Sequence, residues 1–249
     1  MTLNMLMLND DKFEFIIFHS KIISIPASDF KISIQGVDFV PASHVKNLGV
    51  FQDSCLTMEK QINSTTRSCY HNIRKIGRIR HYITTDACRT LVQAMVTSRL
   101  DYANVLLHGL PQTLLGRLQK VQNCAARLIA RSHRRDHITP VLKELHWLPV
   151  EFRSQYKILL YTYKALNGLA PSYISELLQP HIPGRCLRSA SKNLLAVVLP
   201  RTERYGARSF RRSAPVAWNG LPDQLRDAGS LNVFKKHLKT HLFRLAYNL

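Results

Sequence analysis

Asp10-Asp11 is the one pair of adjacent aspartates in the sequence. Closely spaced carboxylates can hold the two Mg²⁺ ions that phosphoryl transfer requires. This pair lies in a polar stretch between Asn9 and Lys12. We expect a solvated turn there.

Two pairs of histidines, His133 with His137 and His237 with His241, have the four-residue spacing that places both rings on one helix face. Such a pair can bind zinc when further ligands complete the site. The five cysteines are scattered and form no Cys-x-x-Cys pair. We expect the histidines on polar or phosphate-facing surfaces, and the cysteines as small buried apolar residues in a reducing compartment. The sequence thus predicts no metal site.

The common catalytic motifs are absent from the sequence. It contains no G-x-x-x-x-G-K, no G-x-G-x-x-G, no H-E-x-x-H and no G-x-S-x-G. A non-haem iron site would need a His-x-Asp pair, and none occurs. We predict no catalytic residue in this chain.

Positive charge is the dominant bulk property of the chain, with a formal net charge of +19. Residues 1–59 carry four Lys or Arg and seven Asp or Glu, residues 60–135 fourteen and two, and residues 185–212 eight and one. Two basic blocks therefore hold most of the excess. Such surfaces attract phosphates and release counterions whatever the base sequence. RNA or DNA is the predicted partner, and the alternative is a generic basic surface, as on a ribosomal or membrane-peripheral protein.

The candidate nucleic-acid contacts are basic residues of these blocks, together with three residues of the first 50. They are Lys12, Lys46, Gly49, Lys60, Arg67, Arg74, Lys75, Arg78, Arg80, Arg117, Lys120, Arg127, Arg131, Arg134, Arg135, Arg208, Arg211 and Arg212. Aromatic residues close to the charges offer surfaces on which unpaired bases stack. These are Tyr70, Tyr82, Tyr205 and Phe210, and each of them also suits a hydrophobic core.

The residue patterns predict an α+β fold that is predominantly helical. Residues 12–18, 31–35 and 45–51 are rich in β-branched and aromatic residues, and they indicate a small antiparallel sheet with a turn at Gly36-Val37-Asp38. After Phe51 the apolar residues recur at helical spacing from Met58 to Ile79.

Further helices are expected along the rest of the chain. One is capped by Thr84, one follows Pro111, a short one lies between Pro140 and Pro149, a longer one covers 151–167, and the last covers 230–247 after Ser230. The proline-rich region 180–222 is irregular, with one strand candidate at Leu194 to Leu199.

Seven sequence blocks, in this order, carry a resemblance to a known family. They are Val45-Lys46-Asn47-Leu48-Gly49-Val50 with Asp53, Thr97-Ser98-Arg99-Leu100-Asp101-Tyr102, residues 118–128 (LQKVQNCAARL), Asp136 to Val150 (DHITP…LHWLPV), residues 163–171 (YKALNGLAP), residues 217–222 (AWNGLP) and residues 234–243 (FKKHLKTHLF). Together they resemble the C-terminal part of the reverse transcriptase of non-LTR, LINE-type retrotransposons, in the group of chicken-repeat and jockey-like elements.

This resemblance implies an organisation in three parts. Residues 1–55 would be the end of the polymerase palm, 56–135 a thumb-like basic helical region, and 136–249 the family's C-terminal helical region with an irregular basic segment at 180–222. Lys12 would lie near the incoming triphosphate, although Phe13 replaces the family's usual threonine. The Leu48-Gly49 turn would match the hairpin that supports the primer end.

The resemblance also implies what the chain does. The full-length parent would be an RNA-directed DNA polymerase that uses Mg²⁺, and its metal-binding aspartates would precede Met1. We therefore expect no polymerase activity and no cofactor for this chain, with sequence-tolerant RNA or DNA binding as its residual role. The alternatives are a relic without function and a domesticated nucleic-acid-binding protein.

The location of the protein follows from two absences in the sequence. The N-terminus has no basic region ahead of its apolar residues, and no apolar run is long enough to span a bilayer. We expect a nuclear or cytoplasmic protein that is neither secreted nor held in a membrane.

Overall fold

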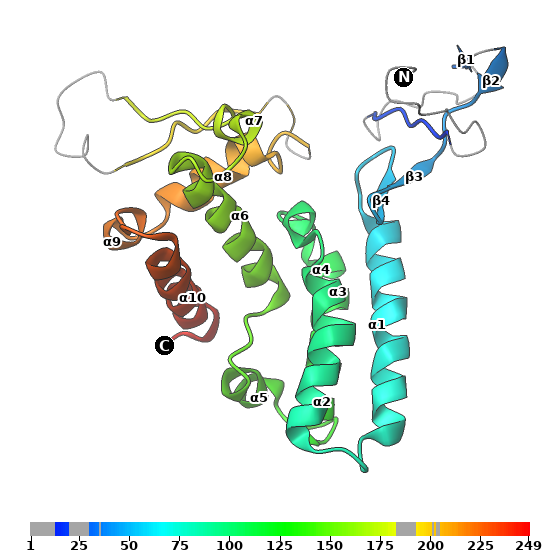
Figure 1. The fold of residues 1–249 in the computed structure, drawn as a ribbon, viewed down its shortest axis with the longest axis vertical. Helices are drawn as coiled ribbons and strands as arrows, with labels where there is room; N and C mark the ends of the chain where they lie inside the picture. Colours follow the sequence, from blue (N-terminus) through cyan, green and yellow to red (C-terminus); the bar gives the residue numbers. More distant parts are fainter. Residues whose placement is uncertain (1–12, 20–29, 35, 183–192, 201, 203–204) are drawn as a thin grey trace, which may run out of the picture. The chain divides into compact units, whose positions relative to one another are not determined.

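The computed structural model describes residues 13–19, 30–34, 36–182, 193–200, 202 and 205–249. The chain divides into two compact units, Met1–Ser64 and Thr65–Leu249. The described residues are predominantly helical, with two small antiparallel sheets near the N-terminus (Figure 1). This confirms the predicted α+β class.

The first unit contains two separate β-hairpins. Strands β1 (Ile32–Ile34) and β2 (Val37–Phe39) form one antiparallel sheet, and β3 (His44–Asn47) and β4 (Val50–Asp53) form the other. The turn predicted at Gly36-Val37-Asp38 is wrong from Val37 onward, because Val37 and Asp38 pair with Ile34 and Ser33.

The strand predicted for residues 12–18 is also wrong over its described part. Residues 13–19 have no regular secondary structure, although Ala42 donates its backbone N–H to Phe15 and His19 donates to Ser54. Isolated bonds of this kind order an extended chain without a ladder of successive pairs. The aromatic and β-branched composition of this segment therefore reflects its packing, as in the Phe13–Phe39 ring contact.

The strand predicted for residues 45–51 is broken by a tight turn at Leu48-Gly49. Leu48 has φ 46° and Gly49 has φ 82°, and Asn47 pairs with Val50 on either side of them. Two central residues with positive φ are the requirement of the two-residue hairpin turn whose twist matches that of the strands. One predicted strand therefore becomes the β3–β4 hairpin.

The Asp53 carboxylate organises the link from β4 to the first helix. It accepts hydrogen bonds from the backbone N–H groups of Cys55, Thr57 and Met58 and from the Thr57 hydroxyl, over distances of 2.8 to 3.2 Å. A carboxylate that gathers several N–H groups before a helix fixes the entry of the chain and suits the positive helix end. Helix α1 (Glu59–Ile79) begins directly afterwards.

A continuous helical rod forms the first part of the second unit beside α1. It consists of α2 (Thr85–Val92), the π-helical turn η4 (Gln93–Thr97) and α3 (Ser98–Asp101). Thr84 caps α2 as predicted, with its hydroxyl accepting from the N–H of Ala87. From α1, Asn72 donates to the carbonyl of Met95 and the Cys69 thiol to that of Val96. These bonds occupy carbonyls in the widened turn.

The remaining elements follow in chain order. They are η5 (Asn104–Leu107), α4 (Gln112–Ala130), α5 (Ile138–Glu144), α6 (Val150–Leu166), α7 (Ser172–Ser175), α8 (Phe210–Asn219), α9 (Asp223–Arg226) and α10 (Leu231–Tyr247). The long helices agree with the predictions, and Ser230 caps α10 with its hydroxyl. The strand candidate at 194–199 is wrong, because only Leu195 forms an isolated bridge, with Pro180.

The main core of the second unit surrounds α6, which contacts both α8 and α10 (Figure 1). Trp218, Phe234, Leu238 and Leu242 are almost completely buried there, and the Tyr163 and Phe234 rings stack at 4.3 Å. The helices before and after residue 135 thus belong to one unit. The boundary expected at 135 falls inside that unit.

Candidate nucleic-acid interface

The C-terminal ends of α1 and α4 are joined by the buried side chain of Arg80. Its Nε donates to the carbonyl of Leu128 and its Nη2 to that of Ile129, both at 2.8 Å. Two more bonds reach the Ile83 carbonyl and the Thr85 hydroxyl. The last carbonyls of a helix have no partner within the helix, and a cation suits their negative end. Arg80 supplies both the hydrogen-bond donors and the positive charge at the end of α4.

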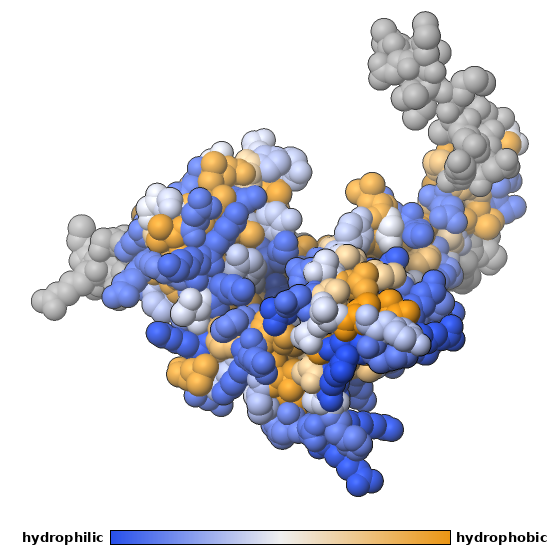
Figure 2. All heavy atoms as spheres, turned by 60° about the horizontal axis from the view of Figure 1, so that its bottom comes forward, coloured by the Kyte–Doolittle hydropathy of each residue, from blue (hydrophilic) through white to orange (hydrophobic). Residues whose placement is uncertain are grey.

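This junction brings two predicted basic segments together. The basic end is defined here by the exposed residues that follow one another on α1 and around the α4 terminus: Arg74, Lys75, Arg78, Arg131, Arg134 and Arg135. Arg131 adopts φ 53° as the C-cap of α4 and donates to the carbonyl of Arg80. Hydrophilic side chains are prominent on the face that Figure 2 turns toward the reader, which carries the α1–α2 turn.

An exposed aromatic residue lies in the same turn. Tyr82 follows α1 directly, and 82% of its surface is accessible. The centroid of its ring is 3.8 Å from that of His81. Of the four aromatic residues predicted as stacking platforms, Tyr70 and Tyr205 are half-buried, and Phe210 packs against the main core. Tyr82 therefore fits the stacking role best.

The acidic groups beside the basic end are few. The Asp136 carboxylate accepts from the N–H of His133 at 2.6 Å, and its carbonyl accepts from Arg127. Arg127 is half-buried, and its Nε has no partner among the described residues. Asp136 thus shapes the turn after α4 and is engaged with the backbone, leaving a strong positive excess around it.

Other predicted contacts lie along the two helices above the basic end. Arg67 on α1 and Arg117 and Lys120 on α4 are exposed. α1 and α4 run side by side in the same direction, with Gly77 of α1 facing Leu128 of α4 (Figure 1). These residues extend the positive surface toward the start of α4.

Three predicted contacts prove to hold the fold together. Arg80 is 7% exposed and fully engaged, as described, so its assignment to a nucleic-acid surface is corrected. Arg208 is half-buried and donates to the carbonyls of His108 and Leu106, and Arg212 donates to that of Val198. Arg211, in contrast, is exposed. The basic block 185–212 therefore contributes few free cations in its described part.

The predicted contacts of the first unit gather around the β3–β4 hairpin. The Nζ atoms of Lys46 and Lys60 lie 5.5 and 4.9 Å from the centroid of the Phe51 ring, and Lys60 also contacts the His44 ring. Gly49 forms the turn. Lys12 and the pair Asp10-Asp11 lie outside the described residues. Among the predicted contacts, the described part of this unit therefore offers two exposed cations beside the Phe51 ring, Lys46 on β3 and Lys60 at the start of α1.

A pocket that the sequence reasoning missed lies elsewhere in the second unit. It is lined by Asp101, Trp147, Arg153 and Lys239, among others. Asp101, Trp147 and Lys239 belong to three separate sequence blocks quoted above, so the blocks themselves were a signal. Their meeting depends on how α3, α6 and α10 pack, which no local pattern reveals.

The chain matches no known family model, no curated protein and no solved structure. Within the described ranges, no three His, Cys, Asp or Glu side chains are grouped so as to hold a metal ion. The same ranges contain no helix of the length and apolarity that crossing a membrane requires.

Proposed function

We propose that this protein binds RNA or DNA with little sequence preference, and that the basic end is the principal contact. The observation that carries the proposal is the Arg80 junction, which sets the cations of α1 beside those of α4 around the exposed Tyr82. Phosphates would meet the cations, and an unpaired base would stack on the tyrosine ring. Neither contact reads a base sequence.

The physical consequence is a strong dependence on salt. If the six cations of the basic end each neutralise one phosphate of a duplex, the logarithm of the binding constant falls with the logarithm of salt at a slope of about −5. Specific recognition of base edges would instead contribute a large part of the binding free energy that salt does not weaken. The slope therefore reports the mode of binding.

The experiment compares two variants of equal charge. One replaces Lys75, Arg78, Arg134 and Arg135 with glutamine, and the other replaces Lys164, Lys235, Lys236 and Arg244. Fluorescence anisotropy with a labelled single-stranded RNA and a labelled DNA duplex gives the affinities at several salt concentrations. We expect the first variant to bind at least about thirtyfold more weakly than the parent. The second variant should stay within about threefold of the parent, because it loses only long-range attraction, which salt screens.

The control variant makes the result decisive. Equal loss of affinity in both variants would show that only net charge matters, which is the behaviour of a generic basic surface. Tyr82→Ala tests stacking separately, because it should weaken the single-stranded RNA by about fivefold or more and the duplex little. Absence of binding at low salt would refute the proposal altogether.

We also propose a parentage for the chain, as the C-terminal part of a non-LTR retrotransposon reverse transcriptase. Its support is the order of the seven sequence blocks, and the palm assignment of residues 1–55 rests on the same blocks. The proposal gives this chain no polymerase chemistry and no Mg²⁺ site of its own. A Tyr-x-Asp-Asp block encoded shortly upstream in the genomic DNA would support it. A separate promoter and intron structure would favour a domesticated binding protein, and a decayed reading frame a relic.

A further inference from the structure

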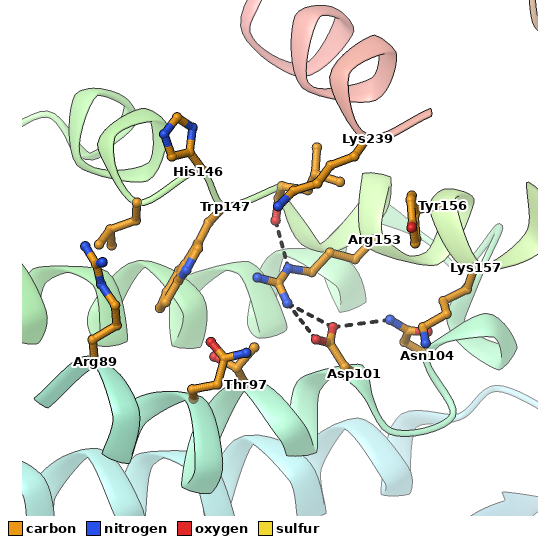
Figure 3. A pocket seen from close by; sticks show the side chains of 13 residues that line it. Arg89, Thr97, Asp101, Asn104, His146, Trp147, Arg153, Tyr156, Lys157 and Lys239 are labelled. Carbon is orange, nitrogen blue, oxygen red and sulfur yellow. Dashed lines mark hydrogen bonds and ion pairs between the residues drawn. The ribbon is translucent and has the colours of Figure 1, made fainter. Parts of the chain in front are cut away.

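A pocket of about 480 Å³ opens in the second unit. The helical rod α2–η4–α3 forms one wall, the turn between α5 and α6 another, and η5, α6 and α10 supply the remaining side chains (Figure 3). Its volume lies within the range of pockets that hold small organic ligands. The described walls all come from one compact unit.

The rod presents four polar side chains to the pocket, from Arg89, Gln93, Thr97 and Asp101. These residues are four positions apart, and in a regular α-helix each step of four drifts about 40° around the axis. The π-helical turn at Gln93–Thr97 holds more residues per turn, so it reduces this drift. The widened turn thus keeps the four side chains on one wall. Such turns are frequent at functional sites.

Arg153 of α6 is oriented in the pocket by three hydrogen bonds. Its Nη1 donates to both oxygens of Asp101, at 2.8 and 2.9 Å, and its Nε donates to the Leu148 carbonyl at 2.9 Å. Its side chain is 14% exposed. Among the described residues, Nη2 has no partner, so a held guanidinium still offers donors to a ligand. Fixed donors lose little entropy on binding.

Trp147 is positioned beside this guanidinium by the end of α5. The N–H of Trp147 bonds to the Leu142 carbonyl and that of His146 to the Lys143 carbonyl, with His146 at φ 53°. This pair of bonds is the Schellman arrangement, which closes a helix and reverses the chain. The Tyr247 hydroxyl of α10 donates to the Trp147 carbonyl. The indole therefore stands 5.9 Å from the Arg153 guanidinium, between Arg89 and Arg153 in Figure 3.

The charge of the pocket is unbalanced. Asp101 is its one acidic lining residue and is paired with Arg153, so Arg89, Lys157 and Lys239 remain. None of the three has an ion-pair partner among the described residues. Lys239 reaches from α10 toward Arg153 (Figure 3). In Figure 3 Arg89 and Lys157 lie at opposite ends of the pocket and Lys239 lies between them, so positive charge is spread along the pocket and favours an anionic ligand.

We propose that this pocket binds a nucleoside monophosphate, either free or as the 5′-terminal nucleotide of a strand. Lys239 and the unpartnered Nη2 of Arg153 hold the phosphate, and the base extends toward Arg89 along the part of the Trp147 indole that lines the pocket. The side chains of Gln93 and Asp101 offer donors and acceptors to the base or the sugar. This inference does not depend on the basic end.

The experiment uses the full chain at about 150 mM salt, where weak surface attraction is screened. Isothermal titration calorimetry measures binding of AMP and UMP, and of adenosine and inorganic phosphate as half-ligands. A 5′-phosphorylated tetranucleotide is compared with its 5′-hydroxyl form to separate strand ends from free nucleotides. The chain has two tryptophans, and Trp147 lines the pocket whereas Trp218 belongs to the core around α6, so a change in tryptophan fluorescence reports binding independently.

We expect the monophosphates to bind at least about tenfold more tightly than either half-ligand, and Lys239→Gln or Arg89→Gln to weaken them about tenfold. Lys236→Gln, one turn away on α10, should change nothing. If the phosphorylated tetranucleotide binds more tightly than its 5′-hydroxyl form, the ligand is the strand end. If the two forms bind equally, the ligand is the free nucleotide. The proposal is overturned if no monophosphate binds, or if Lys239→Gln and Lys236→Gln behave alike. The four-residue variant of the basic end should leave this binding intact, so the two proposals can fail separately.

Discussion

Arg80 shows how one side chain can replace a missing helix partner. Its four hydrogen bonds occupy the Leu128 and Ile129 carbonyls at the end of α4, the Ile83 carbonyl and the Thr85 hydroxyl. These groups are shielded from water by the residues around them, since Arg80 and Ile129 are 7% and 1% exposed. Loss of the guanidinium would leave buried carbonyls without donors, which costs more than the bonds themselves contribute.

We therefore expect Arg80→Met to lower the free energy of unfolding by about 3 kcal/mol, although methionine fills a similar volume. Urea denaturation followed by circular dichroism measures this change. Arg78→Met, half a turn away and exposed, is the matched control and should cost less than about 0.5 kcal/mol. Equal effects of the two substitutions would contradict the junction described for Arg80.

Single residues also mark the limit of what the sequence reveals. Arg74, Arg78 and Arg80 were all predicted as nucleic-acid contacts because they lie in one basic block, and the structure exposes Arg74 and Arg78 but buries Arg80. Its burial depends on carbonyls almost 50 positions further along the chain, which no local pattern contains. The cysteines were predicted as buried apolar residues, and this is confirmed for Cys69, where burial raises the pKa to about 11, and for Cys88. Cys55 and Cys124 are half-buried, and Cys186 lies outside the described residues.

At the scale of elements, periodicity was a good guide to long helices and a poor guide to strands. The starts of α2 and α10 were predictable, because Thr84 and Ser230 place capping hydroxyls before an apolar repeat. The π-helical turn was not, since it depends on bonds from Asn72 and Cys69 of α1. The strand pattern did not show the break at Leu48, because leucine rarely adopts a positive φ, whereas the family resemblance implied a turn at Leu48-Gly49.

That turn gives a prediction about the β3–β4 hairpin. Leu48 is 84% exposed at φ 46°, so its side chain gains little from packing and its backbone is strained. Asn-Gly is the preferred pair for this type of turn. We expect Leu48→Asn to stabilise the hairpin by about 1 kcal/mol, measured as slower hydrogen exchange of the amides in residues 44–53.

A control substitution in the same turn should change the rate of hydrogen exchange in the opposite direction. Gly49→Ala keeps the strands unchanged but places a Cβ at φ 82°, so exchange in the hairpin should become faster. If Leu48→Asn accelerated exchange as well, the positive φ assigned to Leu48 would be wrong.

At the scale of the whole molecule, the charge and class were readable from composition, and the way the parts join was not. The division between the two compact units lies at Ser64, inside the continuous helix α1. Bonds such as that from Gln122 of α4 to the Leu148 carbonyl, at 2.8 Å, tie the sequence before 135 to the sequence after it. Such pairs are distant along the chain and carry no local signature.

The stability of the second unit should depend on pH below neutrality. Burial lowers the pKa of His108 from its ordinary value of 6.5, and Arg208 lowers it further, while Glu151 opposes them. Burial lowers the pKa of His241 as well. The unfolded chain then binds protons more readily than the folded one, so the stability contribution is complete above pH 6.5 and is lost as the pH falls through the lower folded-state pKa.

We expect the free energy of unfolding to decrease from pH 7.5 to pH 5.5, and His108→Gln to reduce the slope in that range. Thermal or urea unfolding at a series of pH values measures it. His237→Gln, on an exposed position of α10, is the control and should leave the slope as in the parent. If the free energy of unfolding of His108→Gln depended more steeply on pH than that of the parent, the lowered pKa of His108 in the folded state would be contradicted.

The side chains that tie separate elements together share one property: many of them end on main-chain carbonyls. Arg80, Gln122, Arg208 and Tyr247 all donate to a C=O group of another element. Every residue type carries that carbonyl, so the accepting position can change its side chain without loss of the bond. Each joint is thus encoded at one of its two ends, and this architecture can tolerate extensive sequence drift at the other end while its elements stay connected.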